Sequence, residues 1–184
     1  QRQLLRQQFP NVSWSVKAGA PLRDGRATTE LTVTGSRQQG PFAFRFVGYQ
    51  QLVLGANGDR FNRQEVIREN SLLRTGDADL KVSLQIPDAV LTGQRYDLDV
   101  VFDDPLEGAV VAGSIRPVTA GELLRMQTPD LPIEALGGGG LFKSVQAPYQ
   151  PGTQTWAVLL VHPKGIVAGS KQVRVVADRA DLNL

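Results

Sequence analysis

Alternation of apolar and polar side chains at every second residue is the feature that most constrains this chain. The alternation is clearest in residues 27–33, 42–46, 80–86 and 95–103. A period of two residues places neighbouring side chains on opposite faces of an extended strand. Each of these segments is therefore predicted to be a β-strand with one buried face and one face in water.

Turn signals separate the strands of the N-terminal part. They are the pairs Asp24-Gly25, Gly40-Pro41 and Asn57-Gly58. Such pairs are typical of the connections between antiparallel strands. We expect an antiparallel meander built from residues 13–19, 26–35, 41–54 and 59–70.

The C-terminal part shows strand patterns that recur every dozen or so residues. The predicted strands are residues 80–86, 95–103, 108–115, 141–147, 155–162 and 170–177. Regularly spaced short strands with Gly and Pro between them indicate a β-sandwich. One short helix is predicted at residues 119–127, where Thr119 and Glu122 have the spacing of a capping box.

The predicted fold class is mainly β, with an antiparallel meander, then a β-sandwich, and the end of a helix at residues 1–8. Pro10 disfavours continuation of that helix. We divide the chain into residues 1–78 and residues 79–184 because charge and pattern both change there. The first part has 11 Lys and Arg against 6 Asp and Glu, and the second has 9 against 12.

Two family resemblances refine this prediction. The segment YQPGTQTWAVLLVHPKGIVAGSKQVRVV looks like the last hairpin of a bacterial immunoglobulin-like domain, and IPDAVLTGQRYDLDVVFDDPL resembles the opening strands of that fold. The resemblance covers residues 79–177 and implies a cysteine-free immunoglobulin-like β-sandwich. Such domains usually act as spacers, docking modules or carriers of another domain. The fold alone does not assign a functional site to this chain.

The segments DGRATTELTVTG and FRFVGYQQLVLGANGDRFNRQEVIREN, after a helix end, are similar to the curved sheet of the nuclear transport factor two superfamily. In that superfamily helices pack against the sheet and enclose a pocket. This chain lacks nearly all of those helices. The resemblance of residues 1–78 therefore leaves a pocket on this sheet as an open alternative.

Four glycines at residues 137–140, followed by Phe142, Lys143 and Ser144, suggest a phosphate-binding loop at first sight. The P-loop motif requires a glycine where Phe142 stands, and a helix afterwards. The run is instead predicted to be a connection or bulge through which the chain crosses between sheets. If this loop contacts a partner, Phe142 and Lys143 are the expected contact residues.

The candidates for catalysis or metal binding are few. His162 is the single histidine of the chain, and no nucleophile motif accompanies it, so we expect a half-exposed histidine at a strand end. The carboxylates that could supply calcium ligands are Asp97, Asp99, Asp103, Asp104 and Glu107. Alternate residues of a strand lie about 6–7 Å apart, so we favour a solvated face and leave calcium binding open. Trp14 and Trp156 are predicted core residues because their neighbours are apolar.

The sequence predicts a non-catalytic protein-interaction or structural module that docks through sheet edges or the N-terminal sheet face. The alternative is a small-ligand or carbohydrate-binding protein with a pocket on that sheet. We predict no cofactor, no nucleic-acid partner and no membrane span, but a protein partner and a homo-oligomer. The absence of cysteine favours an extracytoplasmic location, in the periplasm or cell envelope of a bacterium.

Overall fold

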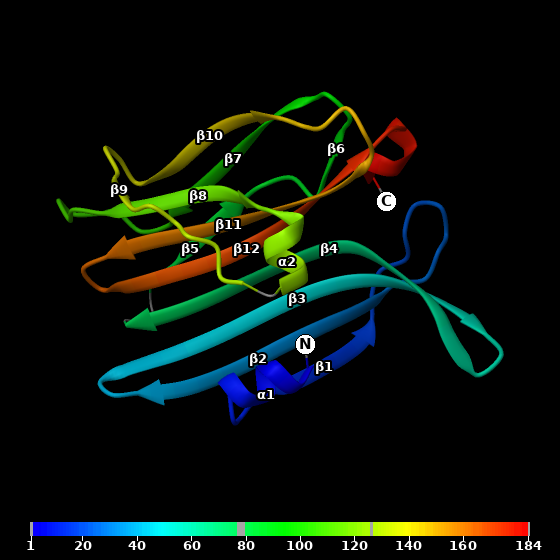
Figure 1. Cartoon of the computed structure of the whole chain (residues 1–184), viewed down its shortest axis with the longest axis horizontal. Coiled ribbons are helices and arrows are strands. Elements are labelled where there is room, and N and C mark those ends of the chain that lie inside the picture. Colours follow the sequence, from blue (N-terminus) through cyan, green and yellow to red (C-terminus); the bar gives the residue numbers. More distant parts are fainter. Residues whose placement is uncertain (1, 77–79, 126, 184) are drawn as a thin grey trace.

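The structure is a computed structural model that describes residues 2–76, 80–125 and 127–183 (Figure 1). The N-terminal part consists of α1 (Arg2–Gln8), β1 (Ser13–Ala18), β2 (Thr29–Gln39), β3 (Phe42–Asn57) and β4 (Arg60–Gly76). The later strands are β5 (Val82–Gln85), β6 (Ala89–Leu91), β7 (Arg95–Phe102), β8 (Ala112–Val118), β9 (Glu134–Ala135), β10 (Gly140–Gln146), β11 (Gly152–His162) and β12 (Gly165–Val176). Two short helices, α2 (Ala120–Arg125) and the 3-10 helix η1 (Arg179–Asn183), complete the described chain. The predicted mainly β class with a short N-terminal helix is confirmed.

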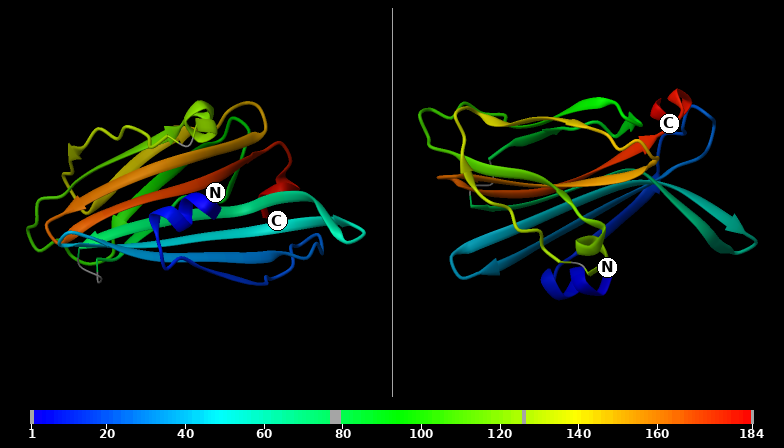
Figure 2. Two further views of the ribbon diagram at one scale, coloured as in Figure 1. Left: turned by 60° about the horizontal axis from the view of Figure 1, so that its bottom comes forward. Right: turned by 45° about the horizontal axis from the view of Figure 1, so that its top comes forward.

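The strands form two sheets that lie face to face (Figure 2). The larger sheet has nine strands with the main order β1-β2-β3-β4-β12-β11-β8-β9, and β6 pairs with β12. The smaller sheet has the order β10-β7-β5. All pairings are antiparallel except that of β6 with β12.

The predicted meander is confirmed by the consecutive pairing of β1, β2, β3 and β4. Its hairpins turn where the sequence suggested, and Gly40 and Gly58 have the positive φ angles of 58° and 61° that glycine adopts without strain. The hairpin of β3 and β4 is longer than predicted. It extends beyond the body of the sheet (Figure 1).

The core of the sandwich lies between the two sheets. Leu98 and Val100 of β7 face Leu160 of β11 and Val173 of β12, and all four side chains are fully buried. Trp156 belongs to this core, as predicted, and its indole Nε1 donates a hydrogen bond of 3.0 Å to the hydroxyl of Tyr96. The buried indole therefore keeps a partner for its one donor.

Two local predictions from the second half are confirmed. The amide nitrogen of Glu122 donates to Oγ1 of Thr119 (3.2 Å), and the amide nitrogen of Thr119 donates to Oε2 of Glu122 (2.8 Å), so α2 begins with a capping box. The glycine run lies between β9 of the larger sheet and β10 of the smaller sheet, where the chain crosses between them. A Cβ at Gly140 would lie 2.4 Å from the carbonyl oxygen of Val100, so this glycine permits the close approach of β10 to β7.

The predicted boundary between residues 78 and 79 lies outside the described residues. The strands on either side of that segment are not confined to separate sheets. Residues 70–76 of β4 pair with residues 165–171 of β12, which joins the meander to the C-terminal strands in one sheet. The division into two domains stays a prediction.

Candidate functional site

One face of the N-terminal sheet carries most of its apolar side chains. The register of β1 to β4 aligns two rows across this face, Trp14–Val33–Gly48–Ser71 and Val16–Leu31–Gln50–Glu69. Gly48 has no side chain at the centre of the first row. The sheet surface is therefore lower there than at its neighbours.

Phe9 anchors α1 above this face. Its side chain is 3% exposed, and its ring stacks on the ring of Phe46 with the centroids 5.4 Å apart. A Cβ at Gly35 would lie 2.9 Å from the Cβ of Phe9, so a glycine in β2 makes room for the phenylalanine. The guanidinium carbon of Arg37 lies 5.6 Å from the centroid of the Phe9 ring. This cation–π contact also holds Phe9 on the sheet.

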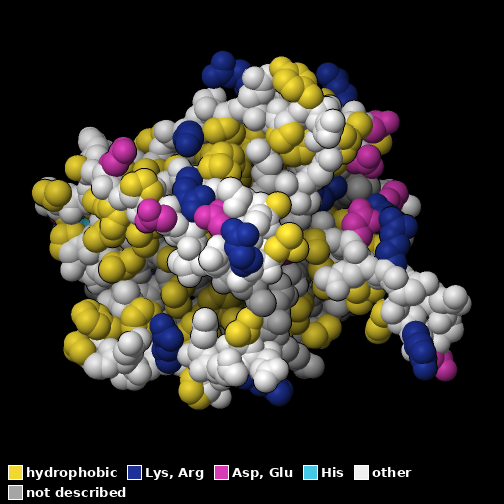
Figure 3. Space-filling view, viewed as in Figure 1, with side chains coloured by type: hydrophobic (Ala, Val, Ile, Leu, Met, Phe, Trp, Pro, Cys, Tyr) yellow, Lys and Arg dark blue, Asp and Glu magenta, His cyan; other side chains and the backbone are white. Residues whose placement is uncertain are grey.

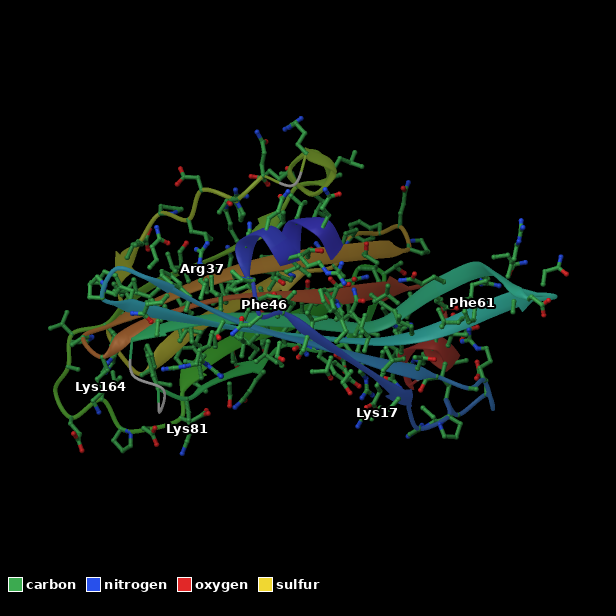
Figure 4. All side chains as sticks on the ribbon, turned by 90° about the horizontal axis from the view of Figure 1, so that it is seen from below. Lys17, Arg37, Phe46, Phe61, Lys81 and Lys164 are labelled. Atoms are coloured by element: carbon green, nitrogen blue, oxygen red, sulfur yellow. The ribbon has the colours of Figure 1, made fainter. Side chains whose placement is uncertain are left out.

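Between α1 and the sheet lies a cavity of about 690 Å³, which we call the α1 hollow. Its lining residues are Leu4, Leu5, Gln8, Trp14, Val16, Leu31, Val33, Phe46, Gly48, Tyr49, Gln50, Glu69, Asn70 and Ser71. Figure 3 shows hydrophobic side chains in the hollowed part of this face, and Figure 4 shows Phe46 on the sheet beside α1. The hollow is apolar over β1 and β2 and polar over β4.

The polar end contains a carboxylate with a defined partner. Nε2 of Gln50 donates a hydrogen bond of 2.9 Å to Oε2 of Glu69. The neighbouring Ser71 hydroxyl lies 2.7 Å from the hydroxyl of Ser170 on β12. A carboxylate accepts several hydrogen bonds, so Glu69 has capacity for a donor from a ligand.

The aromatic residues of the hollow differ in their surroundings. Trp14 is partly buried and lies below Arg6, whose guanidinium carbon is 5.3 Å from the indole centroid. The prediction that Trp14 belongs to the core is wrong, because β1 is the outermost strand of the larger sheet and, among the described residues, the smaller sheet packs on other strands. Tyr49 belongs to the lining, but its phenol contacts Glu30 on the opposite face of the sheet, where burial raises its pKa and the Glu30 carboxylate raises it further.

His162 lines a second, smaller hollow of about 290 Å³, which is formed by residues of the C-terminal part. It ends β11 as predicted, but it is 9% exposed, so the prediction of a half-exposed histidine is wrong. Its ring packs on Phe102 with the centroids 5.4 Å apart, because the ends of β11 and β7 face each other across the core. Nδ1 accepts a hydrogen bond of 3.0 Å from the amide nitrogen of Lys164, which leaves Nε2 as the protonated nitrogen of the neutral ring.

The predicted acidic cluster is spread over the outer surface. Asp97 and Asp99 lie on β7 opposite Ser144 and Phe142 of β10, while Asp104 and Glu107 line the small hollow near His162. Among the residues that the structure describes, no three His, Cys, Asp or Glu side chains come together in a group that could hold a metal ion. Calcium binding by these carboxylates stays an open question.

Phe142 and Lys143 are neighbours on β10 and therefore point to opposite faces of that strand. Phe142 is 67% exposed on the outer face. Lys143 extends toward the core side, where its Nζ lies 5.9 Å from the ring centroid of Trp156. Their role as partner contacts stays a prediction.

Gln50 and Glu69 are site residues that were not predicted from the sequence. The pattern contained a signal for Gln50, because the apolar face of residues 42, 44 and 46 continues through Gly48 to this polar residue. No local pattern identifies Glu69. It reaches the hollow only through its pairing with Gln50 across β3 and β4.

These observations define the chain as a mainly β protein whose larger, mainly antiparallel sheet carries an apolar hollow under its first helix. Residues 77–176 match the family described as Domain of unknown function (DUF8623). Because the match covers more than half of the 184 residues, the chain belongs to this family. The residues that line the α1 hollow all precede the matched segment. No curated protein matches the chain.

The helices of the described residues are short. None of them combines the length and the apolar character that a helix needs to cross a membrane.

Proposed function

We propose that this chain is a non-catalytic binding protein, and that its ligand is a small molecule with a largely apolar body that occupies the α1 hollow. The observation that carries the proposal is the volume and lining of the hollow. Its volume of about 690 Å³ falls within the range of about 300–1,000 Å³ that is typical of ligand sites. A mainly apolar wall with a few polar groups at one end is the usual composition of such sites.

The lining indicates how the ligand lies. The apolar body packs against the side chains of Val16, Leu31 and Val33 on the β1 and β2 side. A hydroxyl or amine at the other end donates to the carboxylate of Glu69, beside Gln50. This arrangement favours an amphiphilic ligand over a carbohydrate, whose many hydroxyl groups would find few partners on the apolar wall.

The non-catalytic part of the proposal is supported by the distribution of reactive groups. Glu69 is the one carboxylate among the described residues that line the hollow, and His162 lies in the smaller hollow instead. General acid–base chemistry usually needs a second titratable group within hydrogen-bond reach of the reacting atoms. The lining of the α1 hollow offers recognition without such a pair.

The two family resemblances are hypotheses about the folds of the two parts of the chain. The placement of α1 across a four-stranded meander supports the comparison with the nuclear transport factor two superfamily. The two facing sheets support the immunoglobulin-like comparison for the later strands. The absence of cysteine favours a location in the cell envelope. Fractionation of the native cells tests this location.

A second candidate is the docking of a partner protein on the same face. It is favoured by the exposure of Leu4 at 40% and Val16 at 67%, both at the rim of the hollow. Apolar side chains exposed together often mark a binding surface. A partner would cover the exposed side chains of Leu4 and Val16, whereas a small ligand would reach the deeper side chains of Leu31 and Val33 as well.

The test is a fluorescence titration of the whole chain with Nile red, a neutral apolar dye, followed by displacement with a panel of long-chain amines, alcohols and acids. Gly48→Val fills the centre of the floor, where a Cβ would already lie 3.2 Å from Cζ of Phe46. We expect dye affinity to fall by about tenfold, which corresponds to ~1.4 kcal/mol.

Val47→Ile is the matched control, because Val47 precedes Gly48 in β3, lies on the opposite face and is 43% exposed. It should leave dye affinity within about twofold of the original. Absence of dye binding, or an equal loss in both variants, would refute a site in the hollow.

A further inference from the structure

Strand β1 has a free edge. It is the terminal strand of the larger sheet and, among the described residues, pairs with β2 alone. Helix α1 lies close to β1 in Figure 1, over the face of the sheet that lines the α1 hollow. In an antiparallel ladder alternate residues direct both backbone groups to one neighbour, so about half of the N–H and C=O groups of β1 point outward.

Natural sheets usually protect such an edge with proline, a bulge or charged side chains such as lysine, which an incoming strand would have to accommodate. Strand β1 contains no proline, and its register with β2 runs without interruption from Ser13 to Ala18. Its one lysine, Lys17, forms an ion pair of 2.9 Å with Glu30 of β2. The charge of Lys17 is therefore compensated within the sheet, and neither proline nor a bulge blocks the edge to another strand.

The side chains of β1 indicate which strand fits. Trp14 and Val16 lie on the face of the α1 hollow, and Val16 is 67% exposed. Ser13, Ser15 and Lys17 lie on the other face. A complementary strand needs apolar side chains on the first face and small or polar side chains on the second, and β1 itself has this pattern.

We propose that the partner of this edge is a second copy of the chain, joined β1 to β1 in an antiparallel pair about a two-fold axis at Ser15. Directly opposed residues of an antiparallel pair point to the same face of the sheet. The two-fold axis must therefore pass between one residue and the same residue of the second copy. With the axis at Ser15, Trp14 faces Val16 of the second copy, and Ser13 faces Lys17 of the second copy. Aromatic and β-branched side chains then meet, and no like charges are opposed.

The pairing brings the two α1 hollows to the same face of one continuous sheet, on either side of the axis. It does not require that either hollow holds a ligand. Two short strands form a small interface, so we expect association at roughly 10–100 μM, in the range of weak interfaces.

The experiment is sedimentation equilibrium of the whole chain over this concentration range, with two charged variants. At a two-fold axis residue 15 meets itself, so Ser15→Lys and Ser15→Glu each oppose two like charges. Each variant alone should be monomeric at concentrations where the original chain dimerises. An equimolar mixture of the two should dimerise again, because each pair then contains opposite charges.

Thr32→Lys is the matched control. Thr32 pairs with Ser15 and lies on the same face, but one strand away from the edge. It should leave the dimer intact. The proposal is overturned if the original chain is monomeric throughout, if both Ser15 variants still dimerise alone, or if their mixture stays monomeric.

Discussion

The anchoring of α1 by Phe9 leads to a prediction that can be worked out from the structure. Helix α1 has seven residues, and isolated helices of that length are not stable in water. Its attachment therefore depends on side chains that pack on the sheet. Phe9 is the most deeply buried of these, at 3% exposure against the ring of Phe46.

Phe9→Ala should release α1 from the sheet. Burial of a phenylalanine side chain contributes about 2–3 kcal/mol. Its loss should raise the equilibrium constant for local opening of α1 by about 30- to 150-fold. The sandwich core around Leu160 is remote from this contact, so the effect should be confined to the N-terminal segment.

Hydrogen exchange measures this opening directly. The amide nitrogen of Phe9 donates to the carbonyl of Leu5 at 2.8 Å, and the amide nitrogen of Val12 donates to the carbonyl of Phe9 at 3.1 Å. In Phe9→Ala both amides at positions 9 and 12 should exchange faster by the factor given above. Nile red affinity should fall as well, since α1 forms one wall of the hollow.

Phe61→Ala is the control, because Phe61 is 76% exposed on the β3–β4 hairpin, away from α1 (Figure 4). It should change none of these rates. The reasoning is refuted if exchange at positions 9 and 12 is unchanged in Phe9→Ala, or if protection falls equally throughout the chain.

Two further predictions concern local stability. The side chain of Arg116 lowers the pKa of Glu122 from 4.5 to about 2, so the stability contributed by ionised Glu122 is present above pH 4.5 and is lost as the pH falls toward 2. In urea denaturation at pH 6, the free energy of unfolding of Glu122→Gln should therefore be lower than that of the original chain. This difference in free energy should shrink steadily below pH 4.5, and a difference at pH 2 equal to that at pH 6 would contradict the prediction. Gly76→Ala should destabilise the chain by more than about 2 kcal/mol, because φ is 92° and the new Cβ would lie 2.3 Å from the carbonyl oxygen of Lys164. Gly58→Ala, with φ of 61° and open space around it, should cost only about 1 kcal/mol, and equal midpoints for the two glycine variants in thermal denaturation would refute the role of the close contact.

The local patterns of the sequence determined the strands and turns of this protein. The alternation in β7 marks residues 96, 98, 100 and 102 as the inner face, and all four side chains are buried. The capping box of α2 joins residues only three positions apart. In both cases the decisive interactions lie within a few residues, so a local pattern suffices.

Short strands without an alternating pattern were not predicted. Strand β6 has three residues and β9 has two, and each is defined by its pairing with a distant strand. A segment of that length carries too little periodicity to indicate a strand. Its backbone hydrogen bonds depend on which neighbour the fold supplies.

Only the tertiary structure decided what the strands of the N-terminal part contribute to a site. Trp14 and Trp156 have similar apolar neighbours in the sequence, yet Trp156 is enclosed between two sheets and Trp14 lines a hollow on an outer strand. Glu69 and Gln50 meet because β3 and β4 pair in one particular register, and β4 in turn pairs with β12, which lies far later in the chain. Burial and proximity of this kind depend on contacts between distant residues, and no pattern within a single segment can specify them.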